Sequence, residues 1–168
     1  MSAIATKSLN ARDSLLRSIA IGGMYIFIIQ AIHMWIVPVL IQKNPFIAAW
    51  QYIASGALGM AAFEGGIATA LLGVIFHLII SFVIASVFIL GAERIPLLRR
   101  NLIVGSLLYG FGVFIVMHMM VTPLSATPPL PAPTLPWLIE AIIEHTLLVG
   151  LALGIIVQRN ANNRASQG

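Results

Sequence analysis

The sequence of 168 residues has no cysteine and very few charged residues. Without cysteine the chain has no disulfide, no thiolate metal ligand and no cysteine nucleophile. Charged residues make up only 8% of the chain, whereas a soluble globular domain carries about 25%. Hydrophobic residues make up 60%, and the mean hydropathy is +1.01. A surface so poor in charge cannot face water over most of its area. The composition therefore predicts an integral membrane protein whose main partner is the lipid bilayer.

The sequence motifs of common soluble enzymes are also missing. There is no Gly-x-Ser-x-Gly, no phosphate-binding loop, no His-Glu-x-x-His and no Gly-x-Gly-x-x-Gly ahead of a helix. The net charge of +4 does not indicate nucleic-acid binding, because the basic residues flank apolar runs and form no basic face. We therefore expect no nucleic-acid partner, and the sequence favours a protein that is not an enzyme.

Four apolar runs have the length of membrane-spanning helices, at about residues 18–41, 67–90, 101–121 and 137–158. Each is long enough to cross a hydrocarbon core of about 30 Å, which takes roughly 20 residues. The first run is too long for a signal peptide, so we expect it to be retained as a span. The predicted fold is all-α: one membrane domain over residues 1–168, built as a four-helix bundle.

Two segments between the spans have their own character. Residues 45–60 are moderately apolar and carry Trp50 and Tyr52, whose rings prefer the interface of the membrane. Asn44 as the cap and Pro45 in the first turn are typical of a helix start, so we predict a short outer interfacial helix here. Residues 122–136 contain six prolines and no charge, which predicts an extended outer loop.

The distribution of basic residues predicts the orientation. In a four-span arrangement eight basic residues lie on one side of the membrane and Lys43 alone lies on the other. Basic residues concentrate on the cytoplasmic side. We therefore expect both termini to lie in the cytoplasm. The eight are Lys7, Arg12, Arg17, Arg94, Arg99, Arg100, Arg159 and Arg164.

Each predicted span contains one histidine. Counted from the outer ends of the spans, His33 and His145 lie about 12 Å deep and His77 about 15 Å deep. His118 is only about 4–5 Å deep and therefore lies nearer the rim. Ionisable groups at such depth usually face a bundle interior or a water-filled cavity. We therefore predict a polar site in the outer half, one to two helical turns below His118.

Other polar residues surround this predicted site. Glu140 and Glu144 are one turn apart and share a face of the fourth span. Gln30 shares a face with His33 on the first span, and Glu64 lies at the outer mouth. The cluster could bind a ligand or a metal ion, or it could sense pH.

A transition-metal site needs several imidazole or carboxylate ligands that converge. The predicted ligands are His33, His77, His145 and Glu144. Methionines beside the histidines would suit Cu(I); these are Met34, Met117, Met119 and Met120.

Three alternatives stay open. The histidines His33, His77, His145 and His118 are also candidates for cofactor binding, and two of them at one depth could hold a b-type haem, which would make the protein an electron carrier. The same groups could relay protons or handle a small solute, as in a transporter subunit. Neutral histidines could also simply hydrogen-bond neighbouring helices.

The chain shows a weak internal repeat. Leu15-Leu16-Arg17 and Leu97-Leu98-Arg99 precede the first and third spans, and both spans end in His-Met-x-aliphatic-x-Pro. The repeat predicts two parallel two-span units related by an axis along the membrane normal. Small residues one turn apart favour close helix packing and would permit a homo-oligomer.

A discontinuous pattern extends from about residue 73 to residue 159. It consists of His77, Ser81, Ala92-Glu93, Pro96, Val116 to Met119, Pro123-Leu124, Thr127 to Leu130, Pro136-Trp137, Glu140, Glu144 and His145. In this pattern the chain resembles the YagU-like bacterial inner-membrane proteins. The resemblance implies a multi-pass protein of the bacterial inner membrane with a link to acid tolerance, and it singles out His77, His118, Glu140, Glu144 and His145. The outer loop of the first half differs, so the resemblance does not support Trp50 or Glu64.

Overall fold

The computed structural model of the chain describes residues 3–129 and 132–165, and all regular structure in these ranges is helical. Five segments are long and apolar enough to cross a membrane. The protein is therefore an all-helical membrane protein, as its composition predicts. The five segments are Arg12–Ile41, Phe46–Phe63, Gly66–Arg94, Leu102–Leu124 and Leu135–Asn162.

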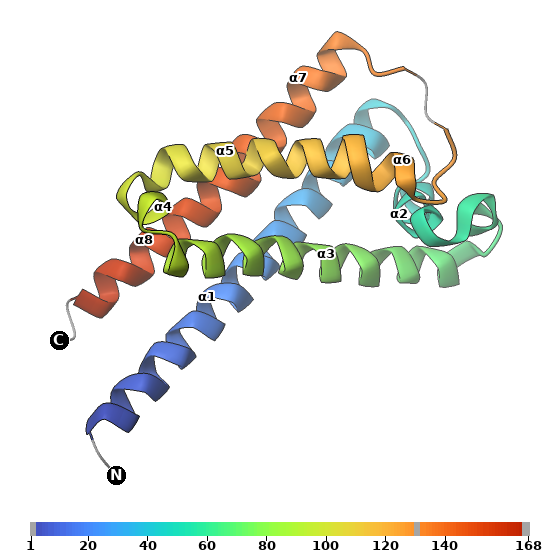
Figure 1. Cartoon of the computed structure of the whole chain (residues 1–168). Coiled ribbons are helices and arrows are strands. Elements are labelled where there is room, and N and C mark those ends of the chain that lie inside the picture. Colours follow the sequence, from blue (N-terminus) through green and yellow to red (C-terminus); the bar gives the residue numbers. More distant parts are fainter. Residues whose placement is uncertain (1–2, 130–131, 166–168) are drawn as a thin grey trace.

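Most helices join end to end into four long rods (Figure 1). Both termini and the short helix α4 lie at one end of the bundle, here called the terminal end. Helix α2 and the loop after α6 lie at the opposite end, here called the loop end. The rods are α1 (Ala3–Met34) with η1 (Trp35–Ile41); α3 (Gly66–Arg94); α5 (Leu102–Ile115) with η3 (Val116–Val121) and α6 (Thr122–Leu124); and α7 (Leu135–Ile143) with η4 (Glu144–Leu151) and α8 (Ala152–Ala165). The shorter elements are α2 (Phe46–Leu58), η2 (Gly59–Phe63) and α4 (Pro96–Arg100).

The rods pack as two close pairs, α1 with α3 and α5 with η4, and glycine allows each close approach. A Cβ atom on Gly110 of α5 would overlap the backbone carbonyl of His145, and one on Gly150 of η4 would overlap the carbonyl of Ser106. On α1, a Cβ atom on Gly23 would lie 2.7 Å from the ring of Phe82. Small residues of this kind let membrane helices meet backbone to backbone.

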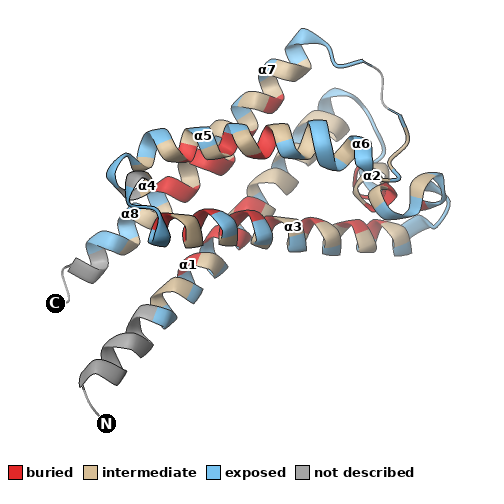
Figure 2. Cartoon of the chain, in the orientation of Figure 1, coloured by how far each residue is buried: buried red, intermediate tan, exposed pale blue. Residues whose placement is uncertain are grey.

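An apolar core joins the two pairs in the middle of the bundle. Side chains from α1, α3, η4 and α8 meet there, and each is at most 2% exposed; they are Ile26, Phe88, Ile89, Val149 and Leu153. Figure 2 shows the buried residues on the facing sides of the rods. The ring of Tyr109 packs on Phe88 with centroids 5.0 Å apart, and its hydroxyl donates a hydrogen bond of 2.7 Å to the carbonyl of Ile84.

Several helix ends differ from the sequence-based prediction. Helix α6 continues to Leu124, so the predicted extended segment 122–136 is too long; the structure has a loop over residues 125–134, of which 130–131 lie outside the described residues. Pro123 lies near the C-terminal end of this rod, and the chain leaves the helix after Leu124. At the next helix, Thr134 is the cap of α7, and its hydroxyl accepts a hydrogen bond of 3.4 Å from the backbone N–H of Trp137.

The predicted cap of the short helix is also wrong. Pro45, not Asn44, precedes the first turn of α2, and no side chain caps this helix. The amide of Asn44 instead donates to Gln42, 3.3 Å away. Lys43, between Gln42 and Asn44, adopts a positive φ of 63° in the turn that connects η1 to α2.

Candidate functional site

Three of the four rods contain a π-helical segment, in which the backbone hydrogen bonds skip one more residue than in an α-helix. His118 lies inside η3, Glu144 and His145 lie inside η4, and His33 lies just before η1. His33 is in the last turn of α-helix α1, and His77 lies within α-helix α3, away from any π-helical segment. π-Helical turns are frequent at functional sites. The π-helical segments therefore indicate the same region of the bundle as His33, His118 and His145.

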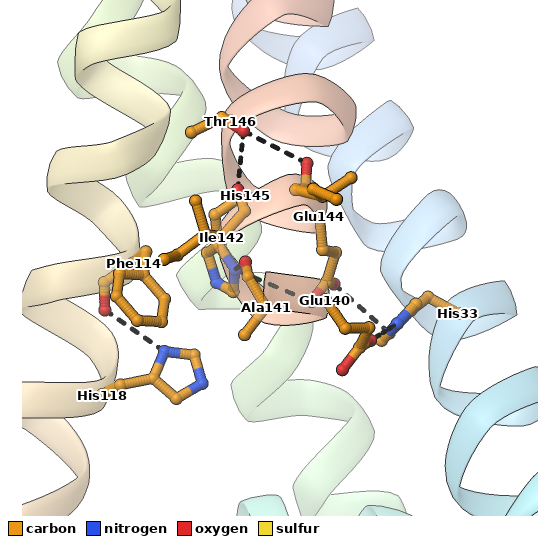
Figure 3. Close-up of polar contacts among 10 residues, drawn as sticks. His33, Phe114, His118, Glu140, Ala141, Ile142, Glu144, His145 and Thr146 are labelled. Carbon is orange, nitrogen blue, oxygen red and sulfur yellow. Dashed lines mark hydrogen bonds and ion pairs between the residues drawn. The ribbon is translucent and has the colours of Figure 1, made fainter. Parts of the chain in front are cut away.

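His33, Glu140 and Glu144 come together between α1 and the α7–η4 rod (Figure 3). One ring nitrogen of His33, Nε2, is hydrogen-bonded to Glu140 Oε1. The other, Nδ1, lies 3.5 Å from Glu144 Oε1. One ligand atom from each of the three residues lies within 4.8 Å of the other two. We call these three residues the His33 cluster.

The local helix geometry explains why the two carboxylates lie on the same side of the rod. Glu140 and Glu144 are four residues apart, so both side chains project from one face of the rod toward α1. Gln30, one turn before His33 on α1, hydrogen-bonds the Glu144 side chain. The Glu144 side chain is 11% exposed, whereas His33 and Glu140 are 23% and 35% exposed. The cluster is thus partly enclosed and can still be reached from outside the bundle.

A cleft of about 510 Å³ opens beside the cluster. Its polar residues are those of the His33 cluster, and its other walls are apolar. Ile139 and Ile143 on its rim are 51% and 50% exposed on the outside of the bundle. The apolar lining residues are Pro136, Ile139, Ile143 and Leu148.

A second pair of histidines packs ring against ring. The centroids of His118 and His145 are 5.2 Å apart, and the ring planes are nearly perpendicular. Nδ1 of His118 donates to the carbonyl of Phe114, 3.2 Å away, and Nδ1 of His145 donates to the carbonyl of Ala141, 2.8 Å away. Because a carbonyl can only accept, Nε2 is the unprotonated nitrogen when these rings are neutral.

The position of His118 departs from the predicted rim. Helix α6 extends this rod to Leu124, so His118 lies six residues below the helix end, or about 9 Å. The prediction placed the helix end at Val121 and therefore made His118 too shallow.

His77 lies apart from both groups. Its ring is 9% exposed and packs between Phe27 and Trp50, with centroids 5.4 and 5.8 Å away. Its Nε2 atom is buried and has no hydrogen-bond partner among the described residues. Gly73, one turn earlier on α3, lets the backbone of α2 approach at Trp50. His77 therefore belongs to the packing of α1, α2 and α3.

The four predicted metal ligands therefore do not converge on a single site. The structure brings His33 and Glu144 together and adds Glu140, which was predicted only as a nearby polar residue. His145 Nδ1 lies 3.6 Å from Glu144 Oε2, but it also faces the Ala141 carbonyl, and its ring packs on His118. His77 packs on Phe27 and Trp50 and is not one of the residues that converge. Glu64 is exposed at the end of η2 and is not among the residues of the cluster or its cleft.

Comparisons with protein-family models, curated proteins and solved structures found no match for this chain. The resemblance to the YagU-like proteins therefore stays a prediction, and the arguments for function below start from the geometry of the cluster.

Proposed function

We propose that the protein is a multi-pass bacterial inner-membrane protein that binds a cation at the His33 cluster, and that a divalent transition-metal ion is the cation its ligands fit. The observation that carries the proposal is the convergence of one imidazole and two carboxylates, with ligand atoms within 4.8 Å of one another. Zinc and similar ions take such nitrogen and oxygen ligands at about 2.0–2.2 Å, so a small inward shift of the side chains would complete the coordination.

In the proposed topology the four rods span the membrane and α2 does not. Helix α2 has 13 residues and is about 20 Å long, which is short for a hydrocarbon core of about 30 Å. It is followed by a break at Gly59, whose φ is 60°, and it lies at the end of the bundle away from both termini (Figure 1). With four spans, the basic terminal end is cytoplasmic and the His33 cluster opens in the outer half. The resemblance to the YagU-like proteins implies a multi-pass inner-membrane protein.

A metal ion fits the cluster better than a haem does. Both ring nitrogens of His33 face carboxylates, so haem ligation would break these interactions. The rings of His118 and His145 contact each other directly, which leaves no space for a macrocycle between them. A divalent ion would instead replace the proton shared between His33 and Glu140, because its ligands must be unprotonated.

Calorimetric titration of zinc into the purified protein in lipid nanodiscs, after chelator treatment, tests the proposal. We expect one zinc ion per chain, and we expect Glu140→Gln and Glu144→Gln each to weaken binding by about tenfold or more, at least as much as loss of an outer-shell group does. Glu64→Gln removes an exposed carboxylate outside the cluster and is the matched control. Equal zinc binding in the wild-type protein and the Glu144→Gln variant, or none in the wild-type protein, would overturn the proposal.

A further inference from the structure

The cleft beside the His33 cluster combines an anionic floor with apolar walls on a single helix face. Pro136, Glu140, Glu144 and Leu148 follow one another at intervals of four residues along the α7–η4 rod, and Ile139 and Ile143 form the adjacent row. Residues at this spacing lie on the same side of a helix. A ligand in the cleft would therefore touch carboxylates and aliphatic side chains at the same time.

The opening of the cleft faces lipid in the proposed topology. Glu140 lies five residues and Glu144 nine residues from the start of α7 at Leu135, which places them about 8 and 13 Å along the helix. At these depths the exposed rim of Ile139 and Ile143 contacts hydrocarbon. A water-soluble ion would have to cross that rim, whereas a molecule dissolved in the membrane would meet it directly.

The cleft is lined by more acidic than basic side chains. Two carboxylates face one imidazole, and no lysine or arginine is among the described residues that line the cleft. Even a protonated His33 neutralises only one of two ionised carboxylates. Charged groups within a membrane are costly unless paired, so with both carboxylates ionised the site is complementary to one further positive charge.

We infer that the His33 cluster takes the head group of a membrane-dissolved amphiphilic amine, which enters sideways from the bilayer with its ammonium group between Glu140 and Glu144 and its alkyl chain along Ile139 and Ile143. This inference rests on the proposed function of the cluster as a cation site, and it names the lipid phase as the source of the cation. A cleft of about 510 Å³ lies within the range of small-molecule sites, about 300–1,000 Å³. Metal and amine would compete for the same carboxylates.

Binding of radiolabelled dodecylamine to the protein in nanodiscs, with empty nanodiscs subtracted, tests the inference. We expect saturable binding that zinc displaces and that Glu140→Gln and Glu144→Gln each weaken by about tenfold or more, because each removes a charge-assisted contact. Ethylamine, which lacks the tail, and dodecanol, which lacks the charge, are expected not to compete.

One substitution separates this inference from the metal proposal. Ile143→Trp fills the cleft but leaves the three ligating residues in place, so it should abolish dodecylamine binding and preserve zinc binding. Ile155→Trp places the same side chain at an exposed position on α8 outside the cleft and should preserve both. All variants are compared only after their thermal unfolding and size-exclusion profiles match those of the wild-type protein.

The outcomes are distinct. Zinc binding without saturable amine binding would overturn the lateral amine site and leave the metal proposal standing. Amine binding that depends on Glu144 and Ile143, without any zinc binding, would support the amine site and overturn the metal as ligand. Amine binding that no substitution changes would reflect partition into lipid and would overturn the inference.

Discussion

The central core and the His33 cluster differ in packing although they share a helix segment. Segment η4 contributes Val149 and Gly150 to the core, where side chains are fully buried and the backbones of η4 and α5 touch. The same segment contributes Glu144 to the cluster, where side chains remain up to 35% exposed beside a cleft. Close packing leaves no room for a ligand, whereas the partly exposed cluster leaves its polar atoms accessible. We infer that the core holds the rods in place and that the cluster is the part of the bundle that can bind a cation.

The largest effect is expected from a change that separates the rods at the core. Gly150→Ala places a Cβ atom against the carbonyl of Ser106 and the backbone of Gly110. Neither neighbour is a flexible side chain that could move away, so the two rods must shift apart. We expect a loss of about 3 kcal/mol or more in the free energy of unfolding, at the upper end of overpacking effects, with lower yield of folded protein. Chemical unfolding in mild detergent measures the change.

Gly112→Ala is the matched control for this variant. Gly112 lies on α5 close to Gly110 in sequence, but a Cβ atom at Gly112 would meet no atom within 4 Å. We expect the free energy of unfolding to stay equal or to rise by up to about 1 kcal/mol, because alanine is the better helix former. Equal destabilisation by both substitutions would show that close backbone contact does not hold the rods together.

The next largest effect concerns the cluster. Zinc at about 100 times its dissociation constant should raise the free energy of unfolding by about 2.7 kcal/mol if it binds only the folded protein. The double variant Glu140→Gln, Glu144→Gln should lose this gain, because it keeps the shape of both side chains but removes the charge. Thermal unfolding with and without zinc measures the effect. A zinc-dependent gain that survives in the double variant would place the metal elsewhere.

Lowering the pH should weaken zinc binding at the cluster. Imidazole and carboxylate groups bind metal only in their unprotonated forms, so each proton that must leave costs up to about tenfold in affinity per pH unit. The proposed ligands are His33, Glu140 and Glu144; His145 lies beside Glu144, and the neutral Gln30 faces it. Zinc titrations across a pH series measure the slope. An affinity that does not change with pH would exclude these residues as ligands.

Hydropathy predicted the helical membrane character of the chain, because long apolar runs have few other stable arrangements in lipid. The ends of the helices were less predictable. Pro123 reads as the start of a loop, yet it lies within the last residues of a rod that ends at Leu124. This extension is why the depth estimate made His118 too shallow. A proline near a helix end is compatible with both outcomes, and contacts in three dimensions select one.

The partners within the site were only partly predictable from the sequence. Equal depth brought His33 and Glu144 into one hypothesis, but depth does not give the direction in which a side chain points. Consecutive residues on a helix point about 100° apart. Glu144 therefore faces His33, whereas the next residue, His145, faces His118. The π-helical turns changed that direction further, and no residue pattern in the sequence signalled them.

The smallest expected effect tests whether the core and the cluster are independent. Tyr109→Phe removes the hydroxyl that donates to the carbonyl of Ile84, but it keeps the ring that packs on Phe88. We expect the free energy of unfolding to fall by about 1 kcal/mol, the typical net contribution of one hydrogen bond. Zinc affinity should stay the same, because Tyr109 is not among the residues of the cluster or its cleft. A parallel loss of zinc affinity would show that the core also sets the geometry of the ligands. The core and the His33 cluster would then not be independent.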